Sequence, residues 1–556
     1  MPKIEVSAEE LARLSGCDFT LGGGLEDMLV PLKAELKSSG DVLKIELNDT
    51  NRPDLWCVEG VARGLAALSG RRRRYLQDLA APDAGIEVDP STAAVRPWIA
   101  AFLADGPGLS EGCLESLIAS QEKLASSFGR NRRTAAIGFY RSGDIAFPVR
   151  YSAVPPGSVS FVPLGQESPM TLSEILEQTE TGRKYAGLLS GMELHPLLTD
   201  ARGCVLSYPP VINSDGTGRL RAGDRDIFCE VTGTDWTTVQ LTASILACNL
   251  EDRGFVIRPA VVSYDRAAPS GGKSTVTPLR FADRLRADRA GIGRITGDVP
   301  SDADIERALS RMGWDGWTIG ADGVEAVMPP YRHDGLHWVD LVEDIAIGYG
   351  IDRFEPLPPE GCTMGSTAPV EDLADAVRIM LTGAGCEELL LPVLTSAARP
   401  GTPPGIVRIL NPMTSEYGAV RNSLLPGLLA AESASAHAPY PHRLFEIGEV
   451  LEDDGGPGGP HTAVRMALVI TGNDAGFGEV HSVIALVCFG RGLSLSLSPA
   501  DDPRFIPGRC CRVVIDGKDA GVMGEIHPAI LTELGIARPS AAIETGLEYL
   551  GGDIQG

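Results

Sequence analysis

The first stretch of the chain alternates apolar and polar positions in a way that predicts a small α/β module. Apolar residues at every second position over 43–47 are typical of a strand with one buried face. The polar residues 48–54 predict a turn, and the apolar run after them predicts a helix that ends at Gly70. A shorter helix is expected over 8–14, so strands and helices already alternate here.

Longer patterns follow in the middle of the chain. A helix is expected over 116–128, and the basic turn GRNRRT follows it at 129–134. The runs VLSYPPVINS (205–214) and DIFCEVTGTD (226–235) have the composition of strands. The apolar spacing over 236–252 predicts another helix, so this region should form a larger α/β domain.

Breaks in composition divide the 556 residues into four predicted parts. An N-terminal α/β module covers 1–80, and the larger α/β domain covers 90–265. A compact small domain covers 275–357, and a further domain of helices and strands covers 358–556. The predicted fold class is therefore a multidomain α+β protein.

The net charge argues against a general affinity for polyanions. Asp and Glu number 74 against 49 Lys and Arg, which leaves a formal net charge of −25. The average field of the protein therefore repels phosphates, and a nucleic acid could bind only at local basic patches or on a partner subunit. The four arginines at 71–74 are a candidate patch, and a solvated basic run after a helix is the alternative.

The cysteines and the N-terminus predict a cytoplasmic protein without a membrane segment. The 11 cysteines form no Cys-x-x-Cys pair, so zinc sites and disulfide frameworks are not expected. The opening residues MPKIEVSAEELARL are acidic where a signal peptide requires a basic start and an apolar run. No uninterrupted apolar stretch reaches the roughly 18 residues of a membrane helix.

Several phrases, in this order along nearly the whole chain, resemble the β chains of phenylalanyl-tRNA synthetases. They are NDTNRPDLWCVEGVARGL, YPPVINS with VTGTD, VMPPYRHDGLHWVDLVEDIAIGYGIDRFEP, and LNPMTSEYGAVRNSLLPGLL with HRLFEIGEVL. The length, and the absence of an inserted oligonucleotide-binding barrel and of a ferredoxin-like domain at the end, resemble the archaeal and eukaryotic cytosolic form. The resemblance implies a separate catalytic α subunit, an (αβ)₂ heterotetramer, and attachment of phenylalanine to tRNA(Phe) with ATP and Mg²⁺. It also implies a small helical, winged-helix-like fold for 275–357 and an antiparallel sheet of the class II synthetase type, without catalytic motifs, for 358–556.

The last part resembles the class II synthetase catalytic fold, but its motifs for ATP are incomplete. Arg443 and Glu446 match the second motif only in part, and GFGEVHSVI (476–484) has no arginine where the third motif would end. Phosphoryl charge must be matched by positioned cations, so adenylation is assigned to the partner. The alternatives are a tRNA-binding or scaffold protein that acts alone, and a free-standing editing hydrolase.

An acidic segment in the third part is a candidate metal site. Asp334 is predicted as a helix N-cap, and Asp340, Glu343 and Asp344 then fall on one helix face. Because like charges at this spacing repel, a metal ion or an arginine is expected nearby; a solvated acidic face is the alternative. In the family that the sequence resembles, a motif of this pattern holds Mg²⁺ shared with the α subunit. That resemblance makes these four residues the predicted ligands.

The resemblance also assigns the second part to hydrolysis of tyrosine wrongly attached to tRNA(Phe). An apolar pocket rejects an added hydroxyl only about a hundredfold, so accurate charging requires a correcting site. Such a site needs a positioned water, hydrogen-bond donors and a partner for the tyrosyl hydroxyl, a role that Asp235 could fill. The candidates are Asn213, Ser214, Thr232, Thr234 and Asp235. Turn formation and helix capping are the alternative roles for them.

Overall fold

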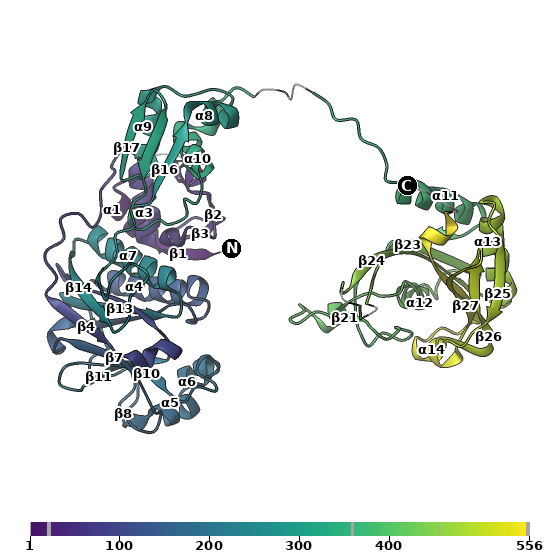
Figure 1. Ribbon diagram of the computed structural model, residues 1–556, viewed down its shortest axis with the longest axis horizontal. Coiled ribbons are helices and arrows are strands. Elements are labelled where there is room, and N and C mark those ends of the chain that lie inside the picture. The colour runs from purple at the N-terminus through teal and green to yellow at the C-terminus, as the bar shows by residue number, and fades with distance from the viewer. Residues whose placement is uncertain are drawn as a thin grey trace. The chain divides into compact units, whose positions relative to one another are not determined.

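Two units of mixed helices and strands make up the chain, and each is described by itself (Figure 1). The structure is a computed structural model that describes residues 2–18, 24–356, 358, 361–453, 455–456 and 458–551. The first unit is 1–358 and the second is 359–556. The α+β multidomain class is confirmed. The three parts expected before 358 belong to one unit, and the boundaries between them stay predictions.

A three-stranded antiparallel sheet with three helices opens the first unit. Its elements are β1 (Lys3–Ser7), α1 (Ala8–Ser15), α2 (Gly24–Leu29), β2 (Ala34–Ser38), β3 (Val42–Leu47) and α3 (Val58–Leu68). The strand order is β1-β3-β2. The predicted strand is confirmed, because Leu43, Ile45 and Leu47 are buried on one face of β3. The predicted end of α3 is confirmed too, since Gly70 follows it with a left-handed φ of 80°.

A ten-stranded sheet forms the middle of the first unit. Its strands are β4 (Ala84–Val88), β5 (Trp98–Asp105), β6 (Ala136–Arg141), β7 (Val149–Val154), β10 (His195–Thr199), β11 (Val205–Tyr208), β12 (Ile212–Asn213), β13 (Asp226–Gly233), β14 (Val256–Tyr264) and β15 (Ser274–Thr277). The order is β12-β11-β10-β7-β4-β14-β5-β13-β6, and β15 pairs with β14. The sheet therefore draws strands from beyond both ends of the predicted range 90–265.

Four helices accompany this sheet. They are α4 (Glu111–Lys123), α5 (Leu172–Gln178), α6 (Glu180–Tyr185) and α7 (Trp236–Asp252). The helix predicted over 236–252 is confirmed as α7, which packs on β5 and β13. The helix expected over 116–128 begins earlier, because Ser110 caps α4 by accepting from the backbone N–H of Cys113. It continues as a π-helical turn over Leu124–Phe128.

The strand predicted over 205–214 is a hairpin, not one strand. It consists of β11 and β12, which pair antiparallel. Pro209 and Pro210 lie between them, and proline has no backbone N–H to donate to a ladder. Asn213 lies at the end of the second strand of this hairpin.

The third part of the first unit combines a three-stranded sheet with three helices. Its elements are β16 (Arg284–Asp288), α8 (Arg289–Thr296), α9 (Asp302–Arg311), β17 (Gly316–Gly320), β18 (Gly323–Val327) and α10 (Trp338–Tyr349), with strand order β16-β18-β17. The prediction that Asp334 caps the helix is wrong. His337 is the N-cap of α10, and its ring accepts from the backbone N–H of Val339.

Buried arginines join these parts. Arg63 of α3 is 7% exposed and donates to Asn249 at 2.6 Å and to Asp252 at 2.8 Å at the end of α7. Its guanidinium also lies over the ring of Tyr331, 4.4 Å from the centroid. The hydroxyl of Tyr75 donates to the same Asp252. One cation therefore holds residues from all three parts.

The arginine run at 71–74 is used within the chain, which neither sequence expectation foresaw. Arg72 donates to the backbone carbonyl of Trp314 and lies over the ring of Trp317. Arg74 donates to Asp315 at 3.2 Å. These bonds attach the first module to the third part of the same unit.

The second unit is built on a seven-stranded sheet. Its main elements are α11 (Pro369–Gly383), β19 (Glu387–Glu388), α12 (Leu425–Ala434), β23 (His442–Glu452), β24 (His461–Thr471), α13 (Phe477–Gly490), β25 (Leu495–Pro499), β26 (Phe505–Ile515), β27 (Lys518–Ile526), α14 (Pro528–Glu533) and β28 (Ser540–Gly546). The order is β19-β23-β24-β28-β27-β26-β25, and only the pairing of β19 with β23 is parallel. A small sheet of β20 (Leu394–Thr395), β22 (Ala419–Val420) and β21 (Val407–Arg408) accompanies it. Among the helices of the described residues, none has the length and apolar character that crossing a membrane requires.

Replacing Arg63 by Ala should lower the stability of the first unit by about 3 to 5 kcal/mol, because Asp252 would stay largely buried without its cation. Amide hydrogen exchange in the full chain measures this as faster exchange of α3 and α7. Arg73→Ala is the matched control. Arg73 is exposed and donates to the carbonyl of Glu251 at 2.8 Å, so its loss should cost no more than about 1 kcal/mol. Unchanged exchange in Arg63→Ala would contradict the role given to this pair.

Candidate functional site

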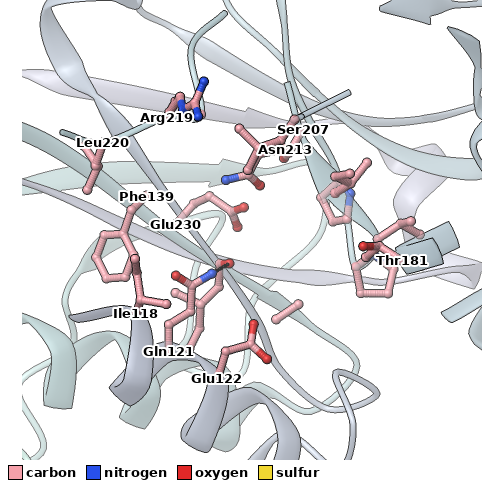
Figure 2. A pocket seen from close by; sticks show the side chains of 18 of the residues that line it. Ile118, Gln121, Glu122, Phe139, Thr181, Ser207, Asn213, Arg219, Leu220 and Glu230 are labelled. Carbon is pink, nitrogen blue, oxygen red and sulfur yellow. Dashed lines mark hydrogen bonds between the residues drawn. The ribbon is translucent and has the colours of Figure 1, made fainter. Parts of the chain in front are cut away.

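A cavity of about 500 Å³ lies beside the ten-stranded sheet in the first unit (Figure 2). Its walls come from α4, from the strands β6 and β13, and from the β11–β12 hairpin. Apolar side chains form much of the lining, including Leu117, Ile118, Ile137, Phe139 and Leu220. Figure 2 shows Ile118, Phe139 and Leu220 grouped on one side. A cavity of this size and lining suits a small, largely apolar group such as an aromatic side chain.

A polar group lies in the same cavity and stands out against the apolar walls. Asn213 and Glu230 point toward one another in Figure 2, from β12 and β13. The hydroxyl of Tyr140 joins them, because it lies 3.1 Å from Glu230 Oε1 and 3.4 Å from Asn213 Oδ1. Hydrogen bonding at one end of an apolar cavity fixes the orientation of whatever binds there.

Glu230 is the unusual member of this group. It is 3% exposed, and burial raises the pKa of its carboxyl to about 7, although Tyr140 and Arg96 act in the opposite direction. Its Oε2 is enclosed and has no hydrogen-bond partner among the described residues. A buried acceptor without a donor costs about 1 to 3 kcal/mol. A ligand hydroxyl placed against Glu230 would remove that cost.

Gly138 makes room for this arrangement. It lies opposite Glu230 in the pairing of β6 with β13. A Cβ atom at Gly138 would overlap both the Tyr140 hydroxyl and Glu230 Oε1. Glycine is therefore the residue that allows the carboxyl and the phenol to meet.

A strained basic turn supports one wall of the cavity. Arg130, Asn131 and Arg132 have φ values of 49°, 54° and 65°, a left-handed conformation that non-glycine residues rarely adopt. The guanidinium of Arg132 donates to the carbonyls of Pro210 at 3.2 Å and Val211 at 3.0 Å. These bonds tie the turn predicted at 129–134 to the hairpin that carries Asn213.

The five predicted editing residues do not gather in one place. Asn213 lines the cavity, and Ser214 is buried next to it in the chain. Thr232 is fully buried, and its hydroxyl accepts from Arg96 Nε at 3.1 Å. Thr234 donates to the carbonyl of Arg133 at 3.1 Å. Of the predicted residues, Asn213 lines this cavity, whereas Thr232 and Thr234 do not; the editing assignment of all five stays a prediction.

Asp235 serves as the N-cap of α7. Its carboxylate accepts from the backbone N–H of Thr238 at 2.8 Å and from the hydroxyl of Thr238 at 2.6 Å. Helix capping, the alternative given for this position, is therefore confirmed. Asp235 lines a different cavity from Asn213.

Sequence reasoning missed Glu230 and Tyr140. The sequence did contain a signal for Glu230, because it is the one charged residue among the neighbours in IFCEVTG. Burying a charged group in a strand is costly unless the group is paired or hydrogen-bonded, so a glutamate in such a strand suggests a specific role. Tyr140 carried no such signal, since aromatic residues are common in strands.

Two of the four predicted metal ligands bind an arginine instead. Asp334 accepts from Arg332 at 2.9 and 2.7 Å. Asp344 accepts from the same Arg332 at 2.7 Å and from the indole N–H of Trp314 at 2.8 Å. Burial acts to raise the pKa of Asp334, but Arg332 outweighs it and lowers that pKa to about 2. The cation expected near these carboxylates is thus the guanidinium of Arg332.

The other two predicted ligands also have partners within the chain. Asp340 accepts from the backbone N–H groups of Leu336 at 2.7 Å and His337 at 2.8 Å, which completes a capping box. Glu343 accepts from Lys33 Nζ at 2.9 Å.

The side chains of the acidic segment do not fit a metal site formed by this chain alone. Within the described residues, no three His, Cys, Asp or Glu side chains are grouped so that they could hold a metal ion. The magnesium assignment stays a prediction for Asp334, Asp340, Glu343 and Asp344. Their arrangement lends it no support.

A smaller cavity of about 260 Å³ lies in the second unit. Arg421 lines it but is 6% exposed and paired at 2.7 Å with the fully buried Glu446. Arg399 lines the same cavity, and its enclosed Nε has no partner among the described residues. Arg443 instead donates to the carbonyl of Ala384 at 3.2 Å.

Comparisons with known proteins agree with one family throughout. The phenylalanyl tRNA synthetase beta chain CLM domain matches residues 355–547, and the tRNA synthetase B5 domain matches 285–351. The chain is 39% identical over 522 residues to the phenylalanine–tRNA ligase β subunit of Treponema pallidum, which covers 90% of this chain and 86% of that protein. It is 34% identical over 570 residues to the corresponding subunit of Borreliella burgdorferi, which covers 99% of both chains.

A solved structure gives the same result. An N-terminal fragment of the phenylalanyl-tRNA synthetase β subunit from Pyrococcus horikoshii matches with a TM-score of 0.59 and 34% sequence identity. It covers 63% of this chain and 99% of the fragment. With relatives above 30% identity along nearly its whole length, the chain belongs to the family of phenylalanine–tRNA ligase β subunits.

Proposed function

We propose that this β subunit works with a separate α subunit, as an (αβ)₂ heterotetramer, to attach phenylalanine to tRNA(Phe) with ATP. The second unit has the antiparallel sheet of a class II synthetase-like domain, yet Arg421 in its cavity is already neutralised by Glu446. One arginine, Arg399, is left to face a phosphate there, whereas the reaction requires at least two positioned cations. Adenylation, with its ATP and Mg²⁺, therefore belongs to the α subunit.

The first unit has the complementary role of hydrolysing tyrosine wrongly attached to tRNA(Phe). The observation that carries this proposal is the buried Glu230, whose Oε2 has no partner among the described residues, in a largely apolar cavity of about 500 Å³. The tyrosyl ring fits the apolar walls, and its hydroxyl donates to Glu230. A phenylalanyl ring would leave Glu230 unpartnered, and sites of this kind discriminate by about 10⁴ to 10⁵.

Hydrolysis requires water to attack the ester carbonyl while the bond to the ribose oxygen breaks, which releases tyrosine and the tRNA hydroxyl. Asn213 lies at the phenol end of the cavity with Glu230, because its carbonyl oxygen is 3.4 Å from the Tyr140 hydroxyl, and its amide N–H groups can donate to the phenol oxygen of the substrate. The cavity lining contains no serine–histidine or cysteine–histidine pair. Water is therefore the nucleophile.

The cytoplasm is the proposed location. All eleven cysteines are free, and nine of them are buried, which fits a reducing compartment. Attachment of phenylalanine to tRNA for protein synthesis takes place there.

Changing Glu230 or Asn213 to Ala should lower kcat/KM for deacylation of tyrosyl-tRNA(Phe) at least tenfold, since each loses a hydrogen bond to the substrate. Phenylalanylation by the αβ complex should stay nearly unchanged. Glu167→Ala is the matched control, because Glu167 is exposed and does not line the cavity. Deacylation of tyrosyl-tRNA(Phe) at the wild-type rate by both variants would rule out this cavity as the editing site.

The pH dependence of kcat/KM for deacylation of tyrosyl-tRNA(Phe) should report the ionisation of the Glu230 carboxyl. Because burial raises its pKa to about 7, its carboxyl loses a proton as the pH rises through that value. A carboxylate accepts from a phenol more strongly than a neutral carboxyl does, so kcat/KM for tyrosyl-tRNA(Phe) should rise with an inflection near 7. Glu230→Gln, which cannot ionise, should lack the inflection. An identical profile in the variant would show that Glu230 does not contact the substrate.

A further inference from the structure

A second cavity, of about 730 Å³, lies on the other side of the basic turn. Lys123 and Arg130 line it together with the hydroxyls of Ser127, Thr134 and Thr238. Its lining also includes the aromatic pair Trp56 and Phe128, whose rings meet edge to face with centroids 6.4 Å apart. Cations, hydroxyls and aromatic rings together are typical of a site for nucleic acid.

The cations of this cavity differ from those at the module junctions. Arg63, Arg74 and Arg253 are paired with carboxylates, so their charge is already neutralised within the chain. Lys123 and Arg130 make no side-chain hydrogen bond or ion pair with any described residue. A free cation attracts phosphate and releases its counterions, whereas a paired one gains little. In a chain with net charge −25, two free cations in one cavity form a local basic site where a polyanion can bind.

The carboxylate that lines this cavity does not neutralise the charges of Lys123 and Arg130. Asp235 is bound to Thr238 through its cap of α7 and makes no ion pair with Lys123 or Arg130.

The strained turn links this cavity to the editing cavity. Arg130 lines one cavity and Arg132, two residues later, lines the other. Both arginines belong to the left-handed segment 130–132, with φ values of 49° and 65°. A chain of nucleotides could therefore contact Arg130 while its terminal aminoacyl group enters the cavity beside Arg132.

We propose that this second cavity binds the sugar–phosphate backbone of the single-stranded acceptor end of tRNA, with Lys123 and Arg130 contacting phosphates. The inference rests on the proposed editing function for the direction in which the tRNA end runs, from the second cavity toward the first. Binding of RNA does not depend on hydrolysis, so the RNA-binding proposal and the editing proposal can fail separately.

The test is the affinity of the αβ complex for uncharged tRNA(Phe) over a series of salt concentrations. The double variant Lys123→Gln, Arg130→Gln should bind several-fold more weakly, and its log–log salt slope should be smaller by about 0.7 to 1 per cation removed. Arg286→Gln is the matched control, because Arg286 is an exposed arginine of β16 outside the cavity. The affinity for tRNA(Phe) that lacks its single-stranded 3′ end then locates the contact on the RNA. If Lys123 and Arg130 contact that end, the double variant and the wild type should bind the shortened tRNA equally well.

Three outcomes would overturn the proposal. The first is unchanged affinity and salt slope in the double variant. The second is an equal loss for full and shortened tRNA, which would place the contact elsewhere on the RNA. The third is failure of the αβ complex to assemble, which would make the cations a docking site for the α subunit. If tRNA binds as expected but the wild-type protein does not deacylate tyrosyl-tRNA(Phe), the proposed editing function is wrong, while the proposal that the second cavity binds tRNA is retained.

Discussion

Buried arginine–carboxylate pairs hold the first unit together, and the position of its functional residues depends on them. Arg63 reaches Asp252 at 2.8 Å, and Arg253 reaches Glu59 at 2.6 Å, so both pairs join α3 to the end of α7. Separating such pairs would leave charges unpartnered in a poorly hydrated interior, which costs far more than the loss of a surface ion pair. The helix that they fix follows directly on β13, which carries Glu230.

The cavity beside β13 differs from the junctions in one respect, because the carboxyl of Glu230 forms no ion pair with an arginine of the described residues. At the junctions, the carboxylates of Asp252 and Glu59 are paired with arginines. Glu230 has only the Tyr140 hydroxyl on one oxygen and nothing on the other. An acceptor without a donor weakens the protein slightly, and under the proposed function it would favour a ligand with a hydroxyl at the right place. The strained turn at 130–132 adds a second local cost, as expected of a region that serves binding rather than stability.

Local patterns predicted elements well and long-range chemistry poorly. The periodicity over 236–252 and the alternation at 43–47 depend on near neighbours, and both elements formed as expected. Asp334 was predicted as a helix N-cap, but Arg332 binds it and His337 is the N-cap. The arginines at 71–74 looked free because their partners, such as Trp314 and Asp315, lie more than two hundred residues along the chain. For the same reason Asn213 could be proposed from its motif, whereas Tyr140 became visible only when strands from distant segments were paired.

The central claim is that the cavity beside β13 accepts a phenol through Glu230. A crystal structure of the αβ assembly with tyrosyl-adenosine, in which an amide replaces the hydrolysable ester, tests it most directly. The tyrosyl ring should lie between Ile118 and Phe139, with its phenol oxygen within about 2.5 to 3.0 Å of the Glu230 carboxyl. A ring bound outside this cavity, or a phenol directed away from Glu230, would contradict the account.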